Sequence, residues 1–216
     1  MAVAERRERE RIARREAILD AAQRLTAEVG YQALRMDAVA EAAELSKGTI
    51  YLYFANKDAL CAGVASRLID ELLPVLEKRL AKTSSGLDAA RQVLQTYFDF
   101  TREHPHHFRF AVSWLSSGER MDDSTESFQR YRERVGRVLQ HAVSAIERGQ
   151  ADGSVRADID PLPQALQLWS SMLGVILINL NKESVSQRLP MPVDLDRVVN
   201  LHIDAMARAL AGKELS

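Results

Sequence analysis

The chain has 216 residues, of which 46% are hydrophobic and 27% are charged, with ten Gly and six Pro. This composition is typical of a chain that folds around an apolar core, and it excludes disordered and fibrous proteins. The formal net charge is −1. Any binding to nucleic acid must therefore depend on a local basic patch and not on the overall charge.

The sequence carries no sign of export or of a disulfide framework. Cys61 is the single cysteine, which excludes an intramolecular disulfide and a thiolate zinc cluster and favours a reducing compartment. The N-terminal residues are highly charged, and no stretch of eighteen apolar residues is uninterrupted. A secretory signal and a membrane span are therefore not expected, and we predict a cytoplasmic protein.

The N-terminal third predicts one long helix followed by two short ones. Apolar residues recur every three or four positions almost throughout, which indicates an all-α chain. The first helix, of roughly four to six turns, should end at Gly30 in the left-handed conformation. Short helices are expected around 36–43 and 47–54. One face of the first helix carries the apolar stripe Ile18, Ala22, Leu25 and Val29.

Longer helices should follow in the rest of the chain. Asn56 is a good N-cap for a helix whose internal Pro74 predicts a kink or a break. Asp160 and Asp194 should begin later helices, and Gly149 should end one. The expected remaining helices cover about 87–104, 108–115, 128–149, 161–180 and 195–211.

Residues 36–54 have the pattern of a helix-turn-helix. Two helices of barely two turns cannot bury much alone, so they need the first helix as a packing partner. Hydrogen-bond donors, methyl groups and aromatic hydroxyls remain on the outer face of the second short helix, without an acid. This mixture suits a DNA major groove. The inward residues are expected to be Val39, Ala40, Ala43, Leu45, Ile50 and Phe54.

The segment 46–60, Ser-Lys-Gly-Thr-Ile-Tyr-Leu-Tyr-Phe-Ala-Asn-Lys-Asp-Ala-Leu, resembles the signature of the TetR family of bacterial transcriptional regulators. The resemblance implies a homodimer that is released from DNA when a small molecule binds. It also implies a helix-turn-helix DNA-binding domain over 1–60 and a ligand-binding and dimerisation domain over 61–216. We expect a three-helix N-terminal domain followed by a larger helical bundle, about nine helices in all.

The resemblance also implies individual DNA contacts. Lys47 and Thr49 would face the groove, Leu52 would meet a thymine methyl group, and both tyrosines of the second short helix would contact phosphate. Alternatively, either tyrosine packs on the first helix. Glu44 stands where the family often has Gly, so it is either left-handed or the turn differs. The complete set of implied DNA-binding residues is Arg35, Ser46, Lys47, Thr49, Tyr51, Leu52, Tyr53 and Lys57.

Two further clusters have ordinary and functional interpretations. Residues 5–16 hold six arginines and four glutamates, which suits a solvated helix, although an arm reaching a minor groove is the alternative. The histidines of 104–107 lack a supporting cysteine, so no metal site is predicted. Phosphate-loop, nucleophile-elbow and zinc-hydrolase motifs are absent from the sequence. We therefore predict no cofactor and a protein that is not an enzyme.

Apolar residues beyond residue 90 suggest an effector pocket and a dimer interface. Aromatic residues concentrate in the middle third, where the family builds its pocket, and Phe98, Phe110 and Trp114 are the candidates for contact with a small hydrophobic or amphipathic effector. Ordinary core packing is the alternative. The apolar residues of 161–180 spread over more than one helix face. The expected two-fold interface contains Leu166, Trp169, Met172, Leu173 and Ile176.

These features together predict a ligand-responsive regulator that binds double-stranded DNA at an inverted repeat and acts as a repressor. One alternative is a DNA-binding protein with a vestigial pocket that is controlled by a partner protein. The other is a small-molecule sequestering protein or an enzyme. Binding to genomic fragments separates the first two from the third, and release by a ligand separates the first from the second.

Overall fold

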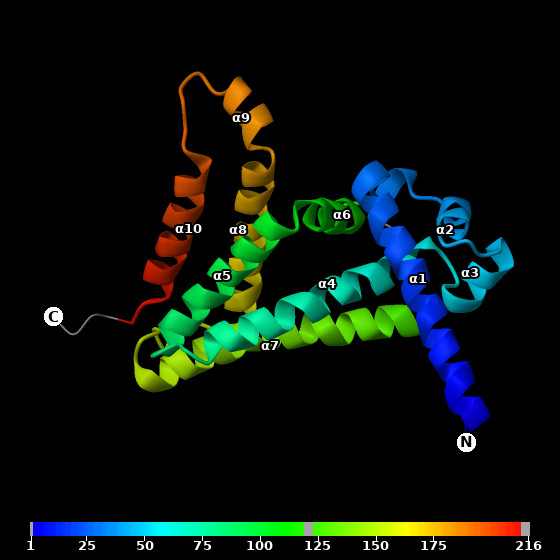
Figure 1. The fold of residues 1–216 in the computed structure, drawn as a ribbon. Coiled ribbons are helices and arrows are strands. Elements are labelled where there is room, and N and C mark those ends of the chain that lie inside the picture. Colours follow the sequence, from blue (N-terminus) through cyan, green and yellow to red (C-terminus); the bar gives the residue numbers. More distant parts are fainter. Residues whose placement is uncertain (1, 119–122, 213–216) are drawn as a thin grey trace. The chain divides into compact units, whose positions relative to one another are not determined.

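The computed structural model describes residues 2–118 and 123–212, and this part of the chain is all-α, as predicted (Figure 1). It contains no strand, only an isolated bridge between Val155 and Ala211. Ten helices are present within the described residues, against about nine expected. Their bounds are α1 Ala2–Ala33, α2 Met36–Ala42, α3 Lys47–Tyr53, α4 Lys57–Leu80, α5 Gly86–Glu103, α6 Pro105–Leu115, α7 Glu126–Asp152, α8 Pro161–Leu180, α9 Lys182–Arg188 and α10 Leu195–Leu210.

The chain divides into two compact units that do not follow the order of the sequence. The first unit comprises Met1–Ile69 and His106–Arg134, and the second unit comprises Asp70–Pro105 and Val135–Ser216. The segment that contains α6 therefore belongs to the same unit as α1, α2 and α3. The functional division at residue 60 stays a prediction, because compactness by itself assigns no function.

The core of the first unit lies where α1, α2 and α3 meet. Val39, Ala40, Ile50 and Phe54 are buried as predicted, and the partly buried Ala43 and Leu45 pack against them. Phe110 and Trp114 of α6 join the same core. The two short helices are too short to bury a core alone, and α1 and α6 supply the apolar surface against which they pack.

Helix α1 is longer than predicted and its break is of another kind. Its charged first turns are helical from Ala2, and ion pairs such as Arg6–Glu10, at 3.2 Å, connect successive turns. Gly30 interrupts the helix with φ 72° and ψ 174°. This is not the predicted left-handed helix stop but a region that is essentially restricted to glycine. One further turn follows and ends at Ala33.

Helix α4 begins as predicted but does not break. The Asn56 side-chain oxygen accepts a hydrogen bond from the Ala59 N–H at 2.8 Å, which confirms the N-cap. The helix continues through Pro74 to Leu80. Pro74 removes one backbone hydrogen bond, and the rest of a 24-residue helix tolerates that loss.

In the second unit, α5, α8 and α10 pack against one another. Gly149 lies inside α7 and does not end it as predicted, because that helix continues to Asp152 and stops before Gly153, at φ 79°. A Cβ atom on Gly86 would lie 1.9 Å from the Gly149 nitrogen. These two glycines therefore allow the start of α5 to lie against α7. Helix α9 was not predicted, because its sequence has no apolar stripe.

Candidate nucleic-acid interface

Helix α3 is fixed at its first turn by a side-chain cap. The Ser46 hydroxyl accepts a hydrogen bond from the Thr49 N–H at 3.2 Å and lies 2.8 Å from the Thr49 hydroxyl. Both predicted DNA-binding residues therefore have a structural role. Their contacts with DNA stay a prediction.

The turn between α2 and α3 resolves the alternatives for Glu44. Its φ is 56°, so the residue is left-handed, which is the first of the two alternatives. The Glu44 N–H donates to the Glu41 carbonyl at 3.0 Å, and the Leu45 N–H donates to the Ala40 carbonyl at 2.9 Å. These bonds close α2 and set the direction of α3.

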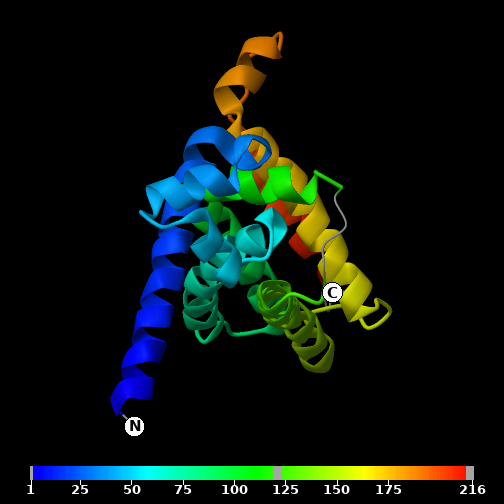
Figure 2. The same cartoon turned by 90° about the vertical axis from the view of Figure 1, so that its right-hand side faces the viewer.

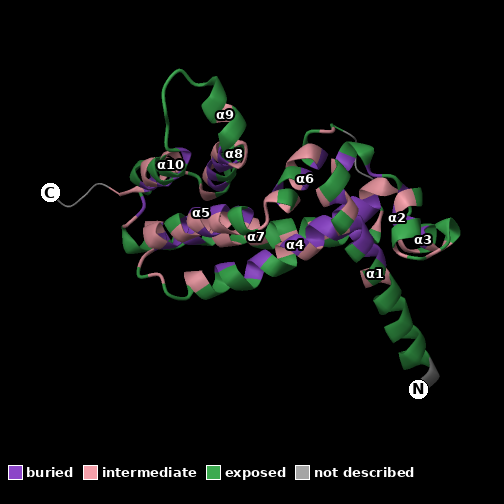
Figure 3. Ribbon diagram, turned by 45° about the horizontal axis from the view of Figure 1, so that its top comes forward, coloured by how far each residue is buried: buried purple, intermediate pink, exposed green. Residues whose placement is uncertain are grey.

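The side chains of α3 differ in how far they are exposed to solvent (Figure 3). Leu52 is 85% exposed and Tyr51 is 43% exposed. A leucine so far from any core is available for an apolar contact such as a thymine methyl group. Tyr53, in contrast, is half-buried and packs against the core of the first unit. The structure therefore favours the packing alternative for Tyr53 but not for Tyr51.

Lys47 is paired in the free protein. Its ammonium lies 2.7 Å from the Asp37 carboxylate on α2, and both side chains are at least half exposed. The hydrogen bond from Lys47 lowers the pKa of Asp37, and the same bond raises the pKa of Lys47. Sequence reasoning missed Asp37, because only the turn geometry brings these two positions together.

Lys57 and Arg35 border the same part of the first unit. The Lys57 ammonium donates to the Gln32 carbonyl at 3.3 Å and lies 4.1 Å from the centroid of the Tyr31 ring. It thereby holds the start of α4 to the end of α1. Arg35 is exposed at the N-terminus of α2, where its backbone is extended and its side chain makes no capping bond. Contact of either residue with phosphate stays a prediction.

A carboxylate that sequence reasoning missed connects α6 to the DNA-binding helices. Asp58 Oδ1 accepts hydrogen bonds from the Tyr31 hydroxyl at 3.1 Å and from the Trp114 indole N–H at 3.2 Å. The side chains of Gln23 and His107 form a second link between α1 and α6, at 2.9 Å. Helix α6 is therefore hydrogen-bonded to both α1 and the first turn of α4.

The structure places the three predicted pocket residues in different units. Phe98 is buried in the second unit, with the Arg102 guanidinium 5.7 Å from its ring centroid. Phe110 and Trp114 are buried in the core of the first unit, where their rings stack at 6.2 Å. Their contact with an effector stays a prediction.

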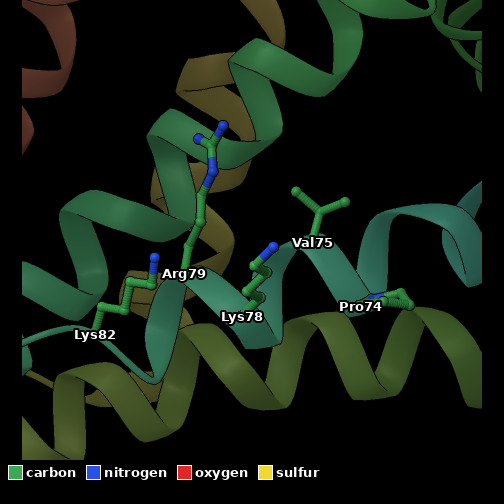
Figure 4. A pocket seen from close by; sticks show the side chains of 5 residues that line it. All are labelled: Pro74, Val75, Lys78, Arg79 and Lys82. Atoms are coloured by element: carbon green, nitrogen blue, oxygen red, sulfur yellow. The ribbon is translucent and has the colours of Figure 1, made fainter.

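A groove of about 440 Å³ lies along the second half of α4 (Figure 4). It combines apolar side chains with three cationic ones, and Arg79 also forms an ion pair with Asp99 of α5 at 2.5 Å. None of the predicted pocket residues lines it. Its lining residues are Pro74, Val75, Lys78, Arg79 and Lys82.

Helix α8 separates the predicted interface residues into two sets. Leu166 is 46% exposed and Trp169 is 41% exposed, and Leu173 is partly exposed. Met172 and Ile176 are completely buried within the protomer. The prediction that these two contact a partner is wrong, because periodicity alone does not show which of two apolar faces is the inner one.

In the described part of the chain, α8 is the one helix whose length and composition would allow it to cross a membrane. Its mean hydropathy is 1.3. About a fifth of that window, 22%, is buried. Across residues 2–118 and 123–212, no three His, Cys, Asp or Glu side chains gather closely enough to hold a metal ion.

Helix α3 is a capped helix of two turns that follows a tight turn and packs on a three-helix core. Its outer face carries hydrogen-bond donors and apolar groups. These features define the helix-turn-helix class of DNA-binding proteins. Two family models match the chain. Residues 18–64 match "Bacterial regulatory proteins, tetR family", and residues 90–206 match "Tetracyclin repressor-like, C-terminal domain". The chain belongs to the TetR family.

The relatives of this chain are regulators and not enzymes. An uncharacterised HTH-type transcriptional regulator of Haemophilus influenzae is 37% identical over 90 residues, 42% of this chain and 48% of that protein, so the match spans about half the relative's length. RutR of Escherichia coli K12, an HTH-type transcriptional regulator, is 27% identical over 161 residues, 74% of this chain and 72% of RutR.

A solved structure of similar fold is that of the Bacillus subtilis transcriptional regulator FadR in complex with stearoyl-CoA. Its TM-score is 0.71 at 17% identity, with 90% of this chain and 98% of FadR covered. At this identity the likeness shows the fold alone.

Proposed function

We propose that this chain is a dimeric transcriptional repressor that binds an inverted repeat in double-stranded DNA and is released by a small amphipathic effector. The exposed face of α3 supports the DNA contact, and the exposed apolar face of α8 supports the dimer. A two-fold dimer presents two copies of α3 to two half-sites, which lie one helical turn of about 34–36 Å apart, or a multiple of it.

One observation carries the proposed release. Helix α6 belongs to the unit that holds α3, and its Trp114 donates a hydrogen bond to Asp58 in the first turn of α4, the helix that follows α3. An effector that shifts α6 must therefore strain the packing beneath α3. Release requires unequal affinity of the effector for the two conformations.

The groove along α4 suggests the chemistry of the effector. Lys78, Arg79 and Lys82 beside Pro74 and Val75 suit a molecule with an anionic head and an apolar tail. The FadR relative was solved with stearoyl-CoA, a molecule of this type. We therefore include acyl-CoA esters and fatty acids in the compounds to be tested.

The test begins with selection of duplexes from a random-sequence library by the full-length protein. Enrichment of an inverted repeat supports the DNA-binding proposal, and the absence of any enriched sequence overturns it. Lys47→Ala should then cost roughly 1–3 kcal/mol per half-site and weaken discrimination at one position of each half-site. Lys57→Ala should weaken all sequences alike and lower the salt slope by about 1.8, for the two phosphate contacts of a dimer.

Release is tested on the enriched duplex with the compounds above. A coupling of about 1–3 kcal/mol is typical, and the duplex must weaken effector binding by the same factor as the effector weakens duplex binding. Calorimetry with and without duplex measures this factor. Equal effector affinity in both titrations would refute release and favour the alternative of control by a partner protein.

A further inference from the structure

The N-terminal half of α1 is a helical extension of the first unit. It continues as helix from Ala2 and projects past α2 and α3 (Figure 2). Residues 4–14 are exposed. Because the segment is helical, its arginines and glutamates have fixed directions, and it is not an extended arm.

The helical geometry separates the two charges, although they are interspersed in the sequence. At about 100° per residue, Arg7, Arg11 and Arg14 lie within roughly 40° of the buried Ile18, and Arg15 lies within about 60° of it. All four glutamates of this segment lie about 80° or more from Ile18. The arginines thus form one basic stripe, Arg7, Arg11, Arg14 and Arg15.

The basic stripe begins beside the recognition helix α3. The Arg15 guanidinium lies 5.3 Å from the centroid of the Phe54 ring, at the end of α3. Arg11 lies one turn further toward the N-terminus, about 6 Å along α1 at about 1.5 Å per residue. Arg7 lies about 12 Å along α1 from Arg15, at about 1.5 Å per residue. The stripe therefore runs along α1 away from the C-terminal end of α3.

Two arginines of the basic stripe are available to a ligand. Arg15 is partly buried, and Arg11 makes two hydrogen bonds to Glu8, at 2.9 and 2.8 Å. Arg7 and Arg14 are exposed, and in the described part of the chain neither has an ion pair. The guanidinium fork binds phosphate oxygens in a bidentate manner.

We propose that the basic stripe, chiefly through Arg7 and Arg14, binds the phosphate backbone of duplex DNA that flanks the half-site contacted by α3. The contact is independent of base sequence and lengthens the footprint of each protomer. It rests on the proposed DNA-binding function. Because the stripe is on a preformed helix, little backbone conformational entropy is lost on binding.

The experiment compares two double variants of the full-length protein. Arg7→Ala with Arg14→Ala removes the two exposed charges of the basic stripe. Arg6→Ala with Arg9→Ala removes two charges from the same helix at positions about 120° and 180° from Ile18. Net charge and helix propensity change equally in the two variants. The probes are two versions of one enriched duplex, one that keeps its flanking base pairs and one trimmed to the half-sites.

On the long duplex, we expect the stripe variant to bind at least tenfold more weakly than the matched variant at about 0.1 M salt, and its salt slope to fall by about 3.6 for the four phosphate contacts of a dimer. On the trimmed duplex the two variants should bind alike. Equal losses on the long duplex would overturn the stripe and leave the DNA-binding function intact. Failure of the unaltered protein to enrich any duplex would overturn both.

Discussion

The hydrogen bond between Trp114 and Asp58 should stabilise the first unit measurably. Trp114 is 3% exposed, and its indole N–H donates to Asp58 Oδ1 at 3.2 Å. A hydrogen bond to a charged acceptor contributes about 1.5–3 kcal/mol. Asp58→Ala leaves the buried indole N–H without this acceptor, which costs about 1–3 kcal/mol.

A double-mutant cycle isolates this bond from the other contacts of the two residues. Trp114→Phe removes the donor and keeps an aromatic ring in the core. If the bond exists, the double variant loses less stability than the two single variants together, by about 1.5–3 kcal/mol. The free energy of unfolding is measured from urea titrations followed by far-UV circular dichroism. Additivity to within about 0.5 kcal/mol would refute the link between α6 and α4.

The cycle also bears on release from DNA. If α6 acts on α3 through Asp58, the single variants should reduce the coupling between effector and duplex without abolishing duplex binding. Coupling that is unchanged in both single variants would show that the effector acts through other contacts.

Three further experiments have defined outcomes. Glu44→Gly should stabilise the protein by about 1 kcal/mol, since glycine adopts positive φ without strain, and an unchanged or lower urea midpoint would contradict this. Gly149→Ala should destabilise it by about 1–3 kcal/mol, because the new Cβ would lie 2.3 Å from a neighbouring side-chain carbon. Gly136→Ala, with open space around it, is the control and should not destabilise α7. Trp169→Asp should give folded monomers in sedimentation, whereas Met172→Asp should unfold the second unit; a stable Trp169→Asp dimer would place the interface elsewhere.

The positions of helices were predictable from the sequence where a single apolar face or a single capping residue determines where the helix begins and packs. The positions of α2, α3 and α4 followed from their apolar spacing and from Asn56, and those of α8 and α10 from Asp160 and Asp194. The side chains that bury the helix-turn-helix were likewise predictable, because only one inward face exists on helices of seven residues.

Contacts between distant segments were not predictable. The pairing of Lys47 with Asp37 depends on the angle set by Glu44, and the Trp114 bond joins residues 56 positions apart. Gly149 was misassigned because a glycine that ends a helix and a glycine that admits a neighbouring backbone look the same in one sequence. Met172 was misassigned because α8 is apolar on both its inner and outer faces.

In the free protein, the Asp37 carboxylate occupies the position beside Lys47 that a DNA phosphate would take in the proposed complex. On the proposed contact of Lys47 with DNA, any duplex would draw the ammonium away from the carboxylate 2.7 Å away and would bring its own negative charge near that carboxylate. Non-specific DNA offers only phosphates in exchange, whereas a correct half-site adds contacts to base edges. Asp37 therefore weakens specific and non-specific complexes by a similar factor. The contacts to base edges then set the ratio of the two affinities, which decides where on a genome such a protein is found.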